Sequence, residues 1–268
     1  MDPSGTFSPV ETYDVPEAEA RGDGLILVCD HASNAVPPTV NPLGLPEEEM
    51  RRHIAWDVGG RGLTLGLAER LRAPAVLSCW SRLVIDPNRC TDDPTLVMKL
   101  YDGTVIEGNR SVDEAETQRR IETLYTPYHV TIDRYLDQMI ADGRPPAIVS
   151  IHSFTPQLKG RPPRPWHVGL LWDRDDRLFR PLYSRLRQER GLDVGDNEPY
   201  SGRLAGDCMW MHGTSRGIPH ILIEVRNDLI GDGAGEQAWA DRLAPVIDAA
   251  LEDLYSSGYG QTEEAQNV

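Results

Sequence analysis

Short apolar segments without alternation limit this chain to one fold class. Each has strand length, and continuous apolar character indicates a strand covered on both faces rather than one that faces water. Segments in which apolar residues recur at helical spacing lie between them. Alternation of the two kinds predicts an α/β fold of three layers (α/β/α), with helices on both faces of a mostly parallel, mixed central sheet. The strand segments are 25–29, 75–79, 147–151, 167–172 and 220–225, and the helical segments are 47–71, 113–141, 174–190 and 236–255.

Interruptions and loops add detail to this pattern. Gly59 and Gly60 break the helical spacing within 47–71, and Pro127 predicts a kink within 113–141. The loops at 80–112 and 153–166 are long and rich in proline, glycine and arginine. Long loops in a compact domain are often functional, so both are candidate parts of a site.

The length of 268 residues fits one large domain or two small ones, and no obvious linker divides the chain. The acidic N-terminus, rich in proline and glycine, has the pattern of neither a signal peptide nor a transit peptide. We therefore expect a flexible segment at 1–23, a single catalytic domain at 24–256 and a disordered tail at 257–268. No apolar run approaches the roughly 18 to 20 residues of a membrane span, which predicts a soluble protein without a membrane partner.

Charge and cysteine content narrow the classes of function. A formal net charge of −15 would repel a phosphate backbone, so we expect no nucleic-acid partner. The four cysteines lie far apart without a C-x-x-C pair, which favours reduced, buried thiols in a cytoplasmic protein. Arginines gather at 81–90 and 159–167, where they either bind a small anion or pair with surface carboxylates. The oligomeric state stays open.

Polar residues follow the apolar segments at their carboxyl ends. Asp30 and His31 come after the first segment, and His152 and Ser153 come after the third. In an open α/β sheet, ligands bind outside the carboxyl ends of the strands, so we expect the two histidines to converge. Two imidazoles and a carboxylate at one point make a mononuclear hydrolytic metal site. Each histidine alone is equally compatible with a core residue that hydrogen bonds satisfy.

Two acidic residues are candidates for the same site. Glu224 lies inside the apolar run ILIEV, where a carboxylate is costly to bury unless it is paired, hydrogen-bonded or close to a metal. Asp57 precedes the two glycines of HIAWDVGG and would either supply the third metal ligand or cap the helix that follows. The other histidines have weaker claims: they fall in helical patterns (His53, His129), in loops (His167, His212) or at a strand start (His220).

Six motifs in a fixed order carry a resemblance to a known family. They are DHASNAVP, HIAWDVGG, SRLVIDPNR, IHSFTP, NEPYSG and IEVRNDLI. From about residue 24 to about residue 250 the chain resembles the N-formylglutamate amidohydrolase family. This implies a phosphorylase/hydrolase-like fold, akin to zinc carboxypeptidases and aspartoacylases, and zinc-dependent hydrolysis of an amide beside a carboxylate. The namesake reaction converts N-formyl-L-glutamate into formate and L-glutamate, which implies a role in amino acid catabolism.

The resemblance also implies roles for single residues. His31 and His152 match the two zinc-binding histidines of the superfamily, and Glu224 matches the general base. Carboxypeptidases have a glutamate three residues after the first histidine, where this chain has Asn34, so Asp57 is our candidate for the third ligand. Residues expected to orient the ligands from outside are Asp30, Asn34 and Ser153.

A substrate carboxylate is the expected partner of the arginines. The pair Asn88 and Arg89 in DPNR resembles the family's carboxylate-binding pair, with Arg82 as a helper and Arg226 as the next candidate. The alternative for Arg89 is an ion pair within its own loop. At the level of the whole protein, an N-acyl amino acid deacylase or a carboxypeptidase-like hydrolase would use the same centre. A non-catalytic carboxylate-binding protein would keep the arginines and need no metal.

Overall fold

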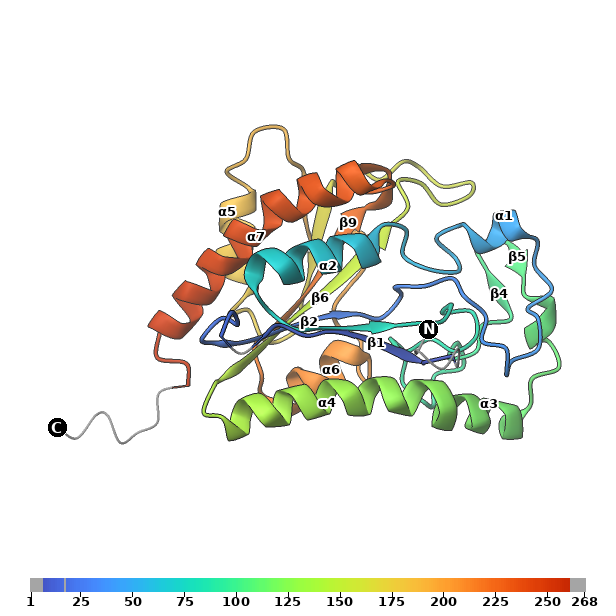
Figure 1. Ribbon diagram of the computed structural model, residues 1–268. Helices are drawn as coiled ribbons and strands as arrows, with labels where there is room; N and C mark the ends of the chain where they lie inside the picture. Colours follow the sequence, from blue (N-terminus) through green and yellow to red (C-terminus); the bar gives the residue numbers. More distant parts are fainter. Residues whose placement is uncertain (1–6, 17, 261–268) are drawn as a thin grey trace.

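The computed structural model describes residues 7–16 and 18–260 and contains a seven-stranded sheet in the order β1-β3-β2-β6-β9-β7-β8 (Figure 1). The four central strands run parallel, whereas β1 and β7 are antiparallel to their inner neighbours and β8 is parallel to β7. A mixed, mostly parallel sheet confirms the expected α/β class. The strands are β1 (Val10–Tyr13), β2 (Gly24–Cys29), β3 (Ala75–Ser78), β6 (Pro146–Phe154), β7 (Val168–Leu171), β8 (Val194–Asp196) and β9 (His220–Arg226).

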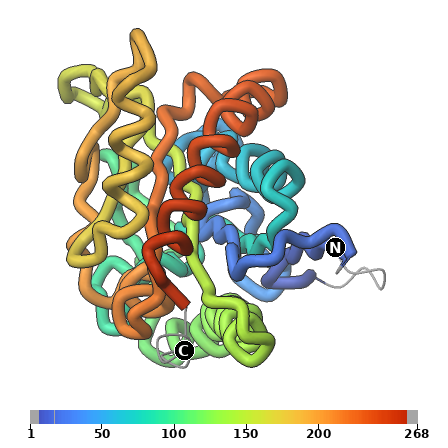
Figure 2. The backbone as a smooth tube through the Cα atoms, turned by 90° about the vertical axis from the view of Figure 1, so that its left-hand side faces the viewer, coloured from blue at the N-terminus to red at the C-terminus, as the bar shows by residue number. Residues whose placement is uncertain are grey.

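Helices cover both faces of the sheet, as expected. On one face α2, α5 and α7 pack against one apolar cluster, and on the other α4 and α6 pack against a second. Successive residues of β2 alternate between the clusters, because strand side chains point to opposite faces. In Figure 2, α4 and α7 again lie on opposite sides of the strands. The helices are α1 (Glu47–Met50), α2 (Gly60–Leu71), α3 (Glu114–Arg120), α4 (Thr126–Ala141), α5 (Phe179–Leu186), α6 (Cys208–His212) and α7 (Gly233–Ser256).

The helical segments differ from expectation in two places. Within 47–71 only the ends are helical, and the residues between α1 and α2 form turns. Gly59 precedes α2 with a φ of 79°, and a Cβ there would lie 2.0 Å from the Ile230 carbonyl oxygen, so glycine is required. Within 113–141 the irregularity is a π-helical turn at Ile121–Tyr125. Pro127 follows this turn as the second residue of α4, so the expected irregularity takes the form of a π turn just before the proline.

The chain ends also differ from expectation. Within the segment 1–23, expected to be flexible, Val10–Tyr13 form the edge strand β1, which pairs with β3. At the other end, the Tyr259 hydroxyl donates to the Pro146 carbonyl at 2.9 Å, so the tail expected at 257–268 begins with a docked residue. Residues 1–6, 17 and 261–268 lie outside the described residues. No helix in the described part of the chain is long and apolar enough to span a membrane.

The buried side chain of Arg120 holds the long loop between β3 and α3 in place. It contains the hairpin of β4 (Leu100–Tyr101) and β5 (Thr104–Val105). The Arg120 guanidinium donates to the Val84 carbonyl at 2.7 Å and to Asn109 Oδ1 at 3.0 Å, and it is 1% exposed. Asn109 Nδ2 in turn donates to the carbonyls of Leu83 (2.6 Å) and Met98 (2.8 Å). The loop is therefore held at several points and can position side chains over the sheet.

Candidate active site

Three residues that the sequence analysis proposed as ligands meet at the carboxyl ends of β2 and β6. His31 and His152 approach with their Nδ1 atoms 3.2 Å apart. Asp57 Oδ2 lies 3.4 Å from His31 Nδ1 and 2.8 Å from His152 Nδ1. All three side chains are buried, and we refer to them as the cavity cluster.

The local fold fixes Asp57 at this point. Its N–H donates to the His31 carbonyl at 2.9 Å, and its Oδ2 accepts from the Ser153 N–H at 3.2 Å. Helix α2 has Gly59 at its N-cap with no side-chain cap bond. The alternative of Asp57 as a helix cap is therefore wrong, because its carboxylate faces the histidines.

The outer nitrogens of both imidazoles are held by carboxylates. His31 Nε2 donates to Asp86 Oδ1 at 2.7 Å, and His152 Nε2 donates to Asp30 Oδ2 at 2.8 Å. An ionised carboxylate can only accept, so each ring carries a hydrogen on Nε2 and points its Nδ1 toward Asp57. Either a proton on His152 Nδ1 or a bound cation can occupy the space between these atoms and the Asp57 carboxylate. A histidine that donates its second N–H to a carboxylate is the usual form of a metal ligand, so the residues fit a divalent ion.

Charge balance around the cavity cluster points the same way. Burial opposes ionisation of Asp86, but Arg82 and His31 hold its pKa far below the usual range. The pKa of Asp30 and that of Asp57 are lowered too, against their burial, by the two histidines. Asp30 and Asp57 in turn raise the pKa of His152 well above its usual range, although burial opposes this. Arg82 and protonated histidine supply the balancing positive charge, and a bound metal ion would supply it in place of the histidine protons.

Asp30 is held by more than His152. Its Oδ1 accepts from the Tyr128 hydroxyl at 2.9 Å, and its Oδ2 accepts from Ser150 Oγ at 3.3 Å. These bonds from α4 and β6 fix the carboxylate that orients the imidazole. Asp30 therefore contacts His152 at the nitrogen that faces away from Asp57.

Glu224 stands beside the cavity cluster on β9, where it is in register with His152 on β6. It is 5% exposed, and its Oε2 has no hydrogen-bond partner. Burial raises the pKa of Glu224 to about 7. A carboxylate with that pKa and a free oxygen is suited to take up and return a proton near neutral pH.

The arginines of the DPNR region lie at the same cavity, which has a volume of about 290 Å³. Arg82 donates to Asp86 Oδ2 from Nε (3.2 Å) and Nη2 (2.9 Å) and contacts Asp57 Oδ1 at 3.5 Å. Arg89 Nε lies 3.8 Å from Asp86 Oδ2, is buried and has no hydrogen-bond partner. Asn88 lines the cavity while its Oδ1 accepts from the Cys208 N–H at 3.0 Å. Arg89 is therefore the arginine with unused donor capacity.

Two residues proposed from sequence lie elsewhere. Arg226 donates to Asp228 Oδ1 at 2.8 Å and to the carbonyls of Pro165 and Trp166, and it does not line the cavity. Asn34 Nδ2 donates to the Met50 carbonyl at 2.9 Å and holds the end of α1. Ser153 does line the cavity, and its Oγ donates to the Val58 carbonyl at 2.8 Å.

The sequence analysis missed several residues at the cavity. Burial raises the pKa of Asp207 to about 7, although its Oδ1 also caps α6 by accepting from the Trp210 N–H. His53 was expected within a helix and instead lies in a turn, where its buried Nε2 has no hydrogen-bond partner and lies 3.6 Å from Asp102 Oδ2. The motifs carried a signal for most of them, since HIAWD, DPNR and NEPYSG contain His53, Asp86 and Tyr200–Gly202. Further lining residues are Tyr101, Phe154, Leu171, Leu204 and Leu222.

Unpaired polar atoms single out this cavity. Among the described residues, three buried side-chain polar atoms lack a hydrogen-bond partner: His53 Nε2, Arg89 Nε and Glu224 Oε2. All three residues line the cavity. A buried polar atom without a partner costs about 1–3 kcal/mol, so such atoms gather where a ligand completes them.

Comparison with known proteins identifies relatives of the whole domain. Residues 23–231 match the family model described as N-formylglutamate amidohydrolase. The solved structure of a gene product from Agrobacterium tumefaciens is 33% identical, with a TM-score of 0.85, over 93% of this chain and 97% of that one. N-formylglutamate amidohydrolase from Ralstonia eutropha JMP134 shares the fold at 21% identity, with a TM-score of 0.72, over 94% of this chain and 100% of that one. No curated protein matches the sequence.

Proposed function

The chain belongs to the N-formylglutamate amidohydrolase family, and from this premise we propose that it hydrolyses the formyl amide of an N-acyl amino acid such as N-formyl-L-glutamate with a bound zinc ion. The observation that carries the proposal is the meeting of the cavity cluster, the unpaired Glu224 oxygen and the unpaired Arg89 nitrogen in one cavity. A volume of about 290 Å³ lies at the lower end of the range for small-molecule sites and suits a substrate of amino-acid size.

The metal would be held by Nδ1 of His31, Nδ1 of His152 and a carboxylate oxygen of Asp57. When bound, a divalent ion of this kind polarises a carbonyl and lowers the pKa of a water molecule toward neutrality. Asp86 and Asp30 keep the two imidazoles in the tautomer that leaves Nδ1 free. The donor set of two nitrogens and one oxygen fits zinc and leaves a coordination position open.

Glu224 supplies the acid and base steps. As its Oε2 takes a proton from the attacking water, the water oxygen forms a bond to the formyl carbon. Glu224 then returns that proton to the amide nitrogen while the carbon–nitrogen bond breaks, which releases formate and the free amino acid. A single carboxyl with a pKa of about 7 can perform both transfers.

Arg89 binds the carboxylate next to the scissile amide. Its buried Nε lacks a partner, and a planar guanidinium offers two parallel donors to a carboxylate. Arg82 is already bonded to Asp86, so its part is to hold that carboxylate and to add positive charge at the cavity wall. We propose that the reaction serves amino acid catabolism in the cytoplasm, where the four free cysteines stay reduced.

A substrate panel tests the proposal. Protein stripped of metal by a chelator and reloaded with zinc would be assayed on four compounds: N-formyl-L-glutamate, N-acetyl-L-glutamate, N-formyl-L-glutamine and the α-amide of N-formyl-L-glutamate. We expect turnover of the first only after zinc is restored, and weak turnover of the α-amide. Preference for the acetyl compound would move the function to a deacylase of larger acyl groups. Tight binding of N-formyl-L-glutamate without hydrolysis would indicate a carboxylate-binding protein.

A further inference from the structure

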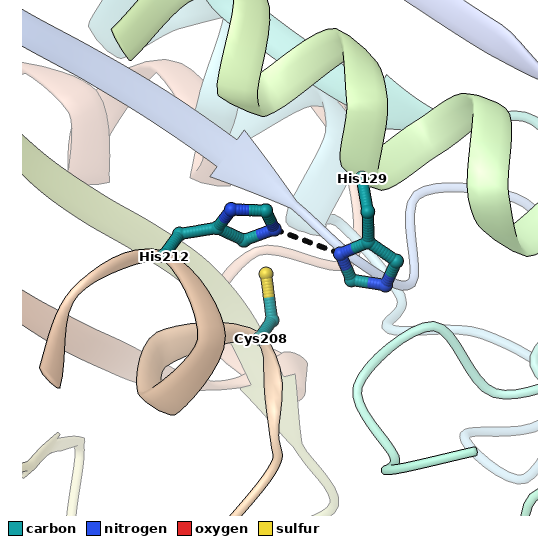
Figure 3. A group of neighbouring side chains, drawn as sticks. All are labelled: His129, Cys208 and His212. Carbon is teal, nitrogen blue, oxygen red and sulfur yellow. Dashed lines mark hydrogen bonds between the residues drawn. The ribbon is translucent and has the colours of Figure 1, made fainter. Parts of the chain in front are cut away.

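A second cluster of ligand-type side chains lies between α4 and α6, away from the cavity. It consists of His129 on α4 with Cys208 and His212 on α6, all buried, and we refer to it as the helix cluster (Figure 3). One ligand atom from each residue lies within 4.8 Å of the others. None of the three residues lines the catalytic cavity, so the proposed function leaves the helix cluster unexplained.

Outer bonds fix the tautomers of both imidazoles. His129 Nε2 lies 3.0 Å from the Pro87 carbonyl, which can only accept, so this nitrogen carries a hydrogen. His212 Nδ1 lies 2.9 Å from Asp133 Oδ1, an acceptor whose pKa is lowered by the bond to His212. The inward nitrogens, His129 Nδ1 and His212 Nε2, are 2.8 Å apart. Either a proton shared between these two nitrogens or a metal ion bound to both can account for their approach.

The position of Cys208 favours a metal ion over a proton shared between the two nitrogens. A proton between two nitrogens needs no third donor, yet the Cys208 sulfur faces the same space from one helical turn before His212 (Figure 3). Burial and the nearby Asp30 carboxylate raise the pKa of the Cys208 thiol well above its usual range. A metal ion that binds this sulfur displaces the thiol proton. One sulfur and two imidazole nitrogens form a donor set typical of zinc.

We propose that His129 Nδ1, Cys208 Sγ and His212 Nε2 bind a second divalent metal ion of the zinc type, with a structural role. The outer partners support this assignment, because metal-bound histidines donate their second N–H to a carboxylate or a backbone carbonyl, and Asp133 and Pro87 supply one of each. Binding releases the Cys208 proton to solvent. None of the three ligands lines the catalytic cavity, so the ion would not contact the substrate.

The ion would position the loop that binds the substrate carboxylate. Three bonds run from this region to the DPNR motif. His129 Nε2 donates to the Pro87 carbonyl, the Cys208 N–H donates to Asn88 Oδ1, and the Tyr125 hydroxyl donates to the Arg89 carbonyl at 2.8 Å. A metal that joins α4 to α6 fixes the origin of all three. The helix cluster would therefore act on substrate binding only through the loop.

Cobalt substitution tests the second site directly. The full-length protein would be stripped of metal and titrated with Co²⁺, and the near-ultraviolet charge-transfer band of a cobalt–thiolate bond would be followed. We expect about two ions per chain and a strong thiolate band in the wild type. His152→Ala, which disables the cavity cluster, is expected to keep the band with about one ion bound. Retention there separates this inference from the proposed function, since that variant lacks hydrolase activity.

Cysteine variants complete the experiment. Cys208→Ser is expected to lose the thiolate band, whereas the matched control Cys79→Ser, at a half-buried thiol outside the helix cluster, keeps it. Circular dichroism of both variants checks the fold, and the wild-type and His152→Ala spectra decide the question if Cys208→Ser does not fold. The inference is overturned if the wild type shows no thiolate band, if Cys208→Ser retains it, or if His152→Ala binds no cobalt.

Discussion

The cavity cluster and the helix cluster share one arrangement but differ in their surroundings. In both, each histidine donates its outer N–H to an acceptor and turns its other nitrogen inward. The cavity cluster opens onto a volume of about 290 Å³ beside an acid without a partner, whereas none of the helix-cluster residues lines that cavity. Catalytic zinc sites keep an open position and structural sites are closed. The two clusters therefore differ in access to the cavity and in the nearby unpaired Glu224, rather than in the arrangement of their histidines. These two features distinguish a catalytic metal site from a structural one.

The free base gives the largest expected effect. Glu224→Gln keeps the shape of the side chain and removes its basicity, so we expect turnover of N-formyl-L-glutamate to fall by about 10²–10⁴-fold while zinc content is unchanged. The matched control is Glu236→Gln, a partly buried acid at the start of α7 that does not line the cavity. Near-normal turnover of Glu224→Gln would show that Glu224 is not the general base beside the cavity cluster.

The next largest effect is expected on substrate binding, which only the cavity cluster should influence directly. Arg89→Lys replaces a planar two-donor group by a point charge, and we expect a loss of about 1.5–3 kcal/mol in kcat/KM for N-formyl-L-glutamate, with little change in melting temperature. The α-amide substrate should lose much less. Equal losses for both substrates together with a lower melting temperature would instead mean that Arg89 only pairs with Asp86 within its loop.

Substitution of the carboxylates that accept from the histidines tests whether they contribute equally to zinc affinity in the two clusters. Asp86 is fully buried, whereas the Asp133 side chain is 46% exposed. We expect Asp86→Asn to weaken zinc binding at the cavity cluster by about 10–100-fold, and Asp133→Asn to weaken binding at the helix cluster less, because water can replace the lost acceptor. Competition titration against a chromophoric chelator measures both. Equal losses of zinc affinity would show that burial of the accepting carboxylate does not set its contribution to metal binding.

Metal removal should affect the two clusters differently: the loss from the helix cluster should mainly lower stability, and the loss from the cavity cluster should mainly lower activity. In His152→Ala only the helix cluster binds an ion, and stripping it should lower the melting temperature by several degrees, because a ligand at 100 times its Kd adds about 2.7 kcal/mol. The same treatment of Cys208→Ser, which retains the cavity cluster, should lower hydrolysis more than stability. Scanning calorimetry and the activity assay, run side by side, show whether the two roles separate.

The sequence predicts the centre of the fold better than its edges. The continuous apolar runs mark β2, β3, β6, β7 and β9 because buried parallel strands have few polar residues. The edge strands β1 (VETY) and β8 (VGD) contain polar residues, so neither forms a continuous apolar run. The turn between α1 and α2 was missed because its apolar residues happen to follow helical spacing while packing against the second apolar cluster.

Strand ends also made part of the candidate site predictable. His31, His152 and Glu224 stand where a strand ends or turns polar, and the structure brings them together with Asp57. Asp86 was not predicted as a partner of His31, because its loop has no period that places a side chain in space. The helix cluster was missed because α6 has only five residues and His129 reads as an ordinary position on a helix.

Arg120 has a consequence for how the long loop above the sheet exchanges its amide hydrogens. Because the guanidinium donates to the Val84 carbonyl and, through Asn109, holds the carbonyls of Leu83 and Met98, local opening of the loop would leave buried hydrogen-bond donors without partners. Its protected amides, such as the Asp86 N–H bonded to the Leu96 carbonyl, should exchange with deuterium only on global unfolding, at the rate of the central strands. Substrate entry would then be a diffusional encounter with a preformed opening, not a gated one.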